Sequence, residues 1–151
     1  MDNKNPALDY TNSLIFELEK AFFDERGKGA RFRMTTIGSK FYEEKCQPVI
    51  KSSDVKEMIQ VIERALMEAG IVVKIDPSIE DRLLRVRIHG CLHRPVEDEM
   101  IFHGVEPFAC IPANLIVRAI EENLNRPVEI AEIKLEDGIC QLLLVLFDPR
   151  S

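Results

Sequence analysis

The spacing of hydrophobic positions divides the chain into a first part with a helical period and a second part that is mainly strand-like. Up to residue 70, apolar side chains recur every three or four positions, as in amphipathic helices. Beyond residue 70 they mostly alternate with polar residues or form short continuous runs, as in strands. This spacing predicts helices over 14–25, 34–46, 54–69 and 112–124, and strands over 71–75, 84–88, 128–135 and 139–147.

Residues at the ends of these segments support the same division. Asp54 and Glu57 form the pattern of a capping box, and Gly70 is typical of a helix end. Pro112 suits the first turn of a helix because its missing N–H would have no partner there. Asp137-Gly138 predicts a short hairpin between the last two strands.

Four segments carry more specific expectations. Asp76-Pro77-Ser78 predicts the turn of the first hairpin, and residues 94–110 are expected to form an irregular connection. The apolar alternation slips between Ile130 and Ile133, which predicts a β-bulge. Residues 142–147 are apolar on both faces, so we expect a central strand covered on two sides.

The order of elements predicts one α+β domain over residues 1–151, a length that fits a single core. Three N-terminal helices are expected to pack on an antiparallel sheet of about four strands, in the order ααα-ββ-α-ββ. Residues 1–10 would be a flexible tail, 11–70 the helical part and 71–147 the ββαββ part.

The net charge of −6 lies entirely in the second half of the chain. Residues 1–75 hold 12 basic and 12 acidic residues, whereas residues 76–151 hold 8 and 14. This balance argues against a general nucleic-acid or anionic-membrane surface. One stretch without acidic residues either contacts phosphate or is a solvated surface, the more common case: Arg26, Lys28, Arg31, Arg33 and Lys40.

The chain is expected to be cytoplasmic. No apolar segment follows a basic one at the amino terminus, and the longest apolar run, Leu142–Phe147, is far shorter than the ~20 residues of a membrane span. The four cysteines form no C-x-x-C pair, so free thiols are expected rather than a disulfide framework.

Metal-ligating residue types gather in the second half, while motifs of common enzyme classes are absent from the sequence. A catalytic role is therefore not favoured. The residues that could bind a soft metal ion or act as reactive thiols are His89, Cys91, His93, His103, Cys110 and Cys140.

Two of these groups have alternative interpretations. In a strand, His89, Cys91 and His93 would share one face and could bind a metal ion, but that face could equally be the solvent face of the hairpin. Cys110 precedes a helix, whose dipole would favour a thiolate; the alternative is a buried cysteine that closes the core.

The stretches Phe108–Ile120, Val128–Leu135 and Gly138–Leu142 resemble the carboxy-terminal half of the 4-vinyl reductase domain family. That family shares an α/β fold with the vesicle-tethering TRAPP subunits. The resemblance implies a zinc site beside a pocket for small apolar ligands. The zinc ligands would be a cysteine before a helix, an acidic residue on the next strand and cysteines around the closing hairpin.

Carried over by position, Cys110 matches the first cysteine, Glu132 the acidic residue and Cys140 the last cysteine. Leu135 stands where a further cysteine is usual in the family, and the hairpin is shorter. A fourth zinc ligand would then come from His103, His93 or water.

These observations predict a binding domain for a small hydrophobic or tetrapyrrole-like ligand that acts as a sensor, a carrier or an assembly factor. Its pocket would be lined by the large apolar residues Phe22, Phe41, Met58, Phe102 and Phe108, each of which could instead be plain core packing. The alternatives are a TRAPP-like scaffold without a ligand and an accessory role in tetrapyrrole metabolism. A homodimer is expected in either case.

Overall fold

Five α-helices and a four-stranded antiparallel sheet make up the described chain, which a computed structural model places over residues 5–32 and 34–150. The α+β class is therefore confirmed, whereas Arg33 of the basic stretch lies outside the described residues. In chain order, with η1 a 3₁₀-helix and η2 a π-helical turn, the elements are α1 (Pro6–Arg26), η1 (Gly27–Phe32), α2 (Ser39–Phe41), η2 (Tyr42–Cys46), α3 (Val55–Glu68), β1 (Lys74–Glu80), β2 (Leu83–His89), α4 (Arg94–Phe102), α5 (Ile111–Leu124), β3 (Val128–Glu136) and β4 (Ile139–Leu146).

The sheet has the strand order β1-β2-β4-β3, with antiparallel neighbours throughout. The turn predicted at Asp76–Ser78 is wrong, because β1 continues through these residues and the chain reverses at Asp81, which has a φ of 57°. Pro77 is tolerated inside β1 because β1 is an edge strand, where a missing N–H need not break a ladder.

The second hairpin agrees with the sequence in detail. Asp137 and Gly138 join β3 to β4 with φ values of 52° and 78°, the left-handed pair that a two-residue turn requires. The register shifts between Ile130 and Glu132, which confirms the predicted bulge.

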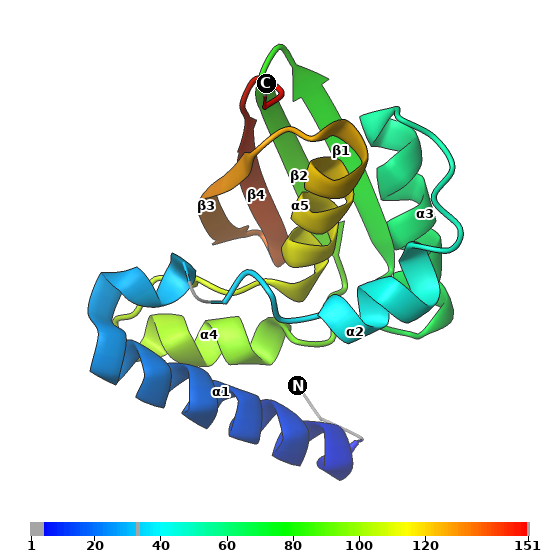
Figure 1. The fold of residues 1–151 in the computed structure, drawn as a ribbon. Helices are drawn as coiled ribbons and strands as arrows, with labels where there is room; N and C mark the ends of the chain where they lie inside the picture. Colours follow the sequence, from blue (N-terminus) through cyan, green and yellow to red (C-terminus); the bar gives the residue numbers. More distant parts are fainter. Residues whose placement is uncertain (1–4, 33, 151) are drawn as a thin grey trace.

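Helices α3 and α5 cover one face of the sheet, and the core lies between these helices and that face (Figure 1). Strand β4 is central, as predicted, but the expected cover on both of its faces is wrong. Leu142 and Leu144 are buried, whereas Leu143 on the opposite face is only partly buried and lies between Arg85 and Glu132 of the neighbouring strands. The stems of such long charged side chains can shield an apolar strand face from water.

Helices α1 and α4 lie side by side beyond the end of the sheet where β2 finishes (Figure 1). Helix α1 begins at Pro6 rather than after residue 10, since Asn5 Oδ1 accepts a hydrogen bond from the Leu8 N–H and Pro6 occupies the first turn. Residues 6–10 are therefore helical and not a tail. No helix within residues 5–32 and 34–150 combines the length and hydropathy needed to cross a membrane.

Two further segments differ from the sequence expectations. Residues 94–102 form α4 instead of an irregular connection, so the observed order has one more helix than ααα-ββ-α-ββ. The helix expected over 34–46 begins only at Ser39, because residues 34–38 form turns and Gly38 has a φ of 101°. Asn114 Nδ2 donates to Met34 O at 2.9 Å and to Ile37 O at 3.1 Å, which holds these turns against the start of α5.

Candidate functional site

A cavity of about 440 Å³ lies between α1, α4 and the start of α5. Two of its lining side chains, Leu18 and Ile37, are exposed, so it opens to solvent between α1 and the turns over 34–38. Most of the described residues that line it are apolar; the full set is Ile15, Leu18, Glu19, Phe22, Met34, Ile37, Cys91, His93, Val96, Glu97, Ala109, Cys110, Ile111 and Pro112.

Three potential metal ligands converge at one side of this cavity. Glu97 comes from α4, Cys110 caps α5, and Cys140 is the second residue of β4. Their ligand atoms lie within 4.8 Å of one another, and the residues are 7%, 5% and 4% exposed. Because Glu97 and Cys110 also line the cavity, a group bound between the three side chains would face into it.

The thiols of Cys110 and Cys91 retain their protons in the absence of a metal ion. A hydrogen bond with Cys140, together with burial, raises the pKa of Cys110 well above its usual value. Burial likewise raises the pKa of Cys91, which follows β2, to about 11. The thiolate expected from the helix dipole at Cys110 is therefore not favoured, because burial and the neighbouring thiol outweigh the dipole.

Two carboxylates in the cavity are also shifted toward their neutral forms. Burial, reinforced by the charges of Glu19 and Asp98, raises the pKa of Glu97 to about 8. Burial raises the pKa of Glu19, on α1, to about 7. Arg94 favours the charged form of Glu97, but its effect is smaller than that of desolvation.

His93 enters the cavity with a defined tautomer. Asn12 Nδ2 donates to Leu92 O at 3.0 Å, which turns Asn12 Oδ1 toward His93 Nδ1 at 3.1 Å. Since an amide oxygen only accepts, Nδ1 carries the proton. Burial lowers the pKa of His93, so the ring is neutral and Nε2 keeps a free lone pair.

The donor set of Glu97, Cys110 and Cys140 fits a zinc ion. Thiolate and carboxylate are both common zinc ligands, and in a tetrahedral site such ligand atoms stand about 3.5 Å apart. The three atoms, which lie within 4.8 Å, would reach that spacing by small side-chain rotations. Three protein ligands leave the fourth position for water or a ligand atom from the cavity.

The structure separates the four residues predicted to bind a metal. Cys110 and Cys140 lie together, and the carboxylate beside them is Glu97. Glu132 is exposed on β3, where it pairs with Lys134 at 3.4 Å. His103 follows α4 and lies 3.6 Å from Glu99.

The His89-Cys91-His93 alternation does not form one strand face. Strand β2 ends at His89, whose Nε2 lies 3.2 Å from Asp76 Oδ2. Cys91 and His93 follow in the connection to α4, where both line the cavity. These two residues therefore belong with the site around Glu97, apart from His89.

The residues predicted to line a pocket are likewise separated. Phe22 lines the cavity, with Arg26 over its ring at 5.9 Å. Met58 is buried in the core, and Phe41 packs against that core. Phe108 packs on Phe23, and Phe102 is 83% exposed.

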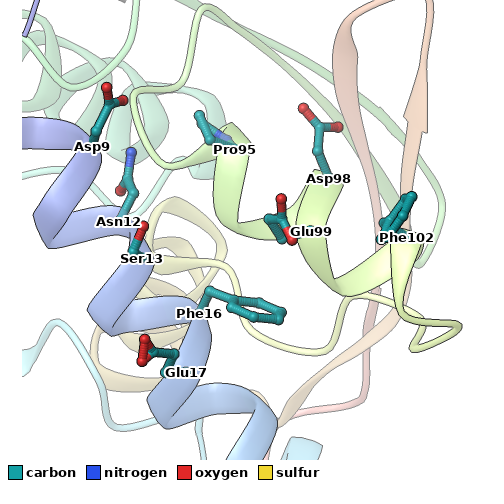
Figure 2. Close-up of a pocket in the computed structure, with 9 residues that line it drawn as sticks. All are labelled: Asp9, Asn12, Ser13, Phe16, Glu17, Pro95, Asp98, Glu99 and Phe102. Carbon is teal, nitrogen blue, oxygen red and sulfur yellow. The ribbon is translucent and has the colours of Figure 1, made fainter. Parts of the chain in front are cut away.

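A second hollow, of about 680 Å³, lies on the outer side of the α1–α4 pair (Figure 2). Asp9 and Glu17 of α1 and Asp98 and Glu99 of α4 line it, together with Phe16, Phe102 and neighbouring polar residues. In Figure 2 the Phe16 ring extends from α1 toward α4. This groove is more polar and more open than the inner cavity, which makes it the weaker candidate for an apolar ligand.

Glu97 and Glu19 are the site residues that the sequence reasoning missed. Pro95 followed by Val96 and Met100, four positions apart, is a helix pattern that could have placed α4 and hence Glu97. Nothing in the sequence distinguishes Glu19 from the exposed acidic residues of the same helix. Its role depends on α1 packing against α4.

Comparisons with known proteins assign no family to the chain. No protein-family model matches it, and no curated protein matches it. A function for the chain therefore has to be argued from the cavity and its residues.

Proposed function

We propose that the chain is a binding domain for a small hydrophobic ligand, held in the cavity between α1, α4 and the start of α5. The observation that carries this proposal is a mainly apolar cavity of about 440 Å³ with a few polar groups at one side. Ligand pockets of folded proteins typically have about 300–1,000 Å³ and this kind of lining. The resemblance of residues 108–142 to the 4-vinyl reductase family supports the same proposal.

We propose zinc as the metal held by Glu97, Cys110 and Cys140. Their placement from α4, α5 and β4 would let one ion join three elements of the fold. Zinc would replace the protons of both thiols and supply a Lewis-acidic position toward the cavity. Cys91 and His93 line the same cavity and are the candidates for a further ligand.

Ligand binding can be tested with naphthalene as a probe. We expect saturable binding by calorimetry and a raised melting temperature, because the apolar lining desolvates the probe. Ala109→Phe places a ring in the cavity and should abolish both effects. Ala131→Phe, on the exposed surface of β3, is the matched control and should retain them. Absence of naphthalene binding to the unaltered protein, with no thermal shift for larger aromatic or tetrapyrrole probes, would overturn the proposal.

Elemental analysis of the purified protein tests the metal. We expect about one equivalent of zinc, lost in Cys110→Ser and in Cys140→Ser because three protein ligands are the usual minimum for a stable site. Cys46→Ser changes a buried cysteine of the core far from Glu97 and should keep the zinc. Zinc retained in both site variants would contradict the assignment.

A further inference from the structure

The polar side chains that face the cavity carry no positive charge, and the acceptors among them that a ligand can use are the carboxylate of Glu19 and the unprotonated ring nitrogen of His93. Among its described lining residues there is no lysine, arginine, serine, threonine or amide side chain. The polar side chains are two carboxylates, a neutral imidazole and two thiols. A ligand that fits this lining therefore needs a hydrogen-bond donor, and a negatively charged ligand would be repelled.

Glu19 presents such an acceptor from α1. No described side chain forms a hydrogen bond or ion pair with its carboxylate, and the neighbouring ionisable group is Glu97. Glu97 is engaged with Cys140 and would be taken by a bound zinc ion. Glu19 remains available to a ligand whether or not the metal is present.

His93 adds a neutral acceptor from the connection between β2 and α4. The hydrogen bond from Asn12 fixes the proton on Nδ1, which leaves the Nε2 lone pair for a donor. An ammonium group has three N–H donors and one positive charge, so it can pair with Glu19 and also donate to a neutral imidazole. A hydroxyl group offers one donor and no charge.

We propose that the ligand class of this cavity is the apolar amine, with its ammonium group paired to Glu19 and its hydrocarbon part packed against Phe22, Val96 and Pro112. This inference rests on the proposed function, because it names the ligand of the same cavity. It adds that charge, in addition to hydrophobicity, selects the occupant. The pairing removes the uncompensated burial of a carboxylate, which is costly in an apolar lining.

Three probes of matched shape test the class: naphthylethylamine, naphthylethanol and naphthylacetate. We expect calorimetry near neutral pH to show the amine binding about tenfold more tightly than the alcohol, as for a hydrogen bond to a charged partner, and the acetate binding most weakly. The order should hold with and without added zinc.

Glu19→Gln keeps the shape of the side chain and removes its charge. In this variant the amine and the alcohol should bind within about threefold of each other, since the charged partner is lost. Glu17→Gln, on the same helix but lining the outer groove, is the control and should keep the preference for the amine. Melting temperatures of both variants check that they fold.

The outcomes separate this inference from the proposed function. If naphthalene and the alcohol bind but the amine has no advantage, or if Glu19→Gln retains the advantage, the amine class is overturned and the apolar cavity stands. If none of the three probes nor naphthalene binds, both are overturned. An advantage that is lost in Glu19→Gln and kept in Glu17→Gln supports the amine class.

Discussion

Asn114 is the residue that connects the start of α5 to the mouth of the cavity. Its side chain is 4% exposed and donates to the carbonyl groups of Met34 and Ile37, both of which line the cavity. Asn114→Ala removes both hydrogen bonds and leaves Ile37 O without this donor, while Met34 O keeps the Ile37 N–H, so we expect a loss of about 1–2 kcal/mol in the free energy of unfolding. Urea unfolding measures this loss, and naphthalene binding should weaken because the turns over 34–38 are no longer held.

Thr11→Ala is the control for this prediction. Thr11 is exposed and its hydroxyl donates to Ala7 O within the same helix. Its removal should change the free energy of unfolding by less than about 0.5 kcal/mol and leave binding unchanged. Equal effects of the two substitutions would contradict the role given to Asn114.

The site residues differ in how far the sequence could place them. Cys110 and Cys140 stand next to strong boundary patterns, a helix start and a hairpin, but only the resemblance to the 4-vinyl reductase family predicts that they lie together. Glu132 and Glu97 are both acidic residues near such elements. Glu132 points to solvent from β3, whereas the packing of α4 brings Glu97 to the cysteines. Neither of these two features can be read from a local sequence pattern.

Helix α1 forms one wall of the cavity while contributing little to the core. Of its 21 residues Asn12 is the buried one, and the helix packs on α4 and η1. Local opening of a segment costs less free energy when few apolar contacts are lost. We therefore expect amide hydrogen exchange in α1 to be faster than in α3 and α5, and to slow when naphthalene is bound.

Helix α3 supplies the internal control for the exchange experiment. Its residues Met58, Ile59, Ile62 and Leu66 are buried against the sheet and far from the cavity. Exchange in α3 should be slow and insensitive to the probe. If α1 exchanges as slowly as α3, or if the probe protects both helices equally, α1 is not the mobile wall of the cavity.

Hydrophobic periodicity predicts the elements of the sheet layer, such as α3 and β4, better than it predicts α4, which lies beyond the end of the sheet. The stripe of α3 and the continuous apolar run of β4 were both assigned from spacing. Helix α4 was missed because its nine residues include a proline and three successive acidic residues, Glu97–Glu99. Val96 and Met100, four positions apart, are the helix pattern that this segment carries, whereas its packing against α1 is not visible in the sequence.

For the whole molecule, burial of Glu19 and Glu97 ties folding stability to pH. Their pKa values in the folded protein are about 7 and about 8, against an ordinary value of 4.5. Between these limits the folded chain keeps protons that the unfolded chain releases, so the free energy of unfolding of the metal-free protein should fall as pH rises from about 4.5 to about 8. Each retained proton contributes a slope of up to about 1.4 kcal/mol per pH unit.

Urea unfolding across this pH range, with a chelator present, measures the slope. Glu97 faces Glu19 from α1, Asp98 and Arg94 from its own helix, and Cys140 from β4. Glu97→Gln should remove the decline between about pH 7 and pH 8 and about half of the decline below pH 7, whereas Glu19→Gln should remove the other half below pH 7. Glu17→Gln changes the net charge equally at an exposed position of α1 and should leave the slope intact.

Added zinc should reverse this dependence. Zinc binding at this site displaces the protons that Glu97 and Cys110 keep in the folded protein, so its affinity rises with pH. The zinc-dependent increase in melting temperature should therefore be larger at about pH 8 than at about pH 6, because ligation strengthens as protons become scarce. Cys140→Ser should abolish the increase at both pH values. A zinc effect that is constant with pH would place the ion at groups already ionised, such as the exposed carboxylates of the outer groove.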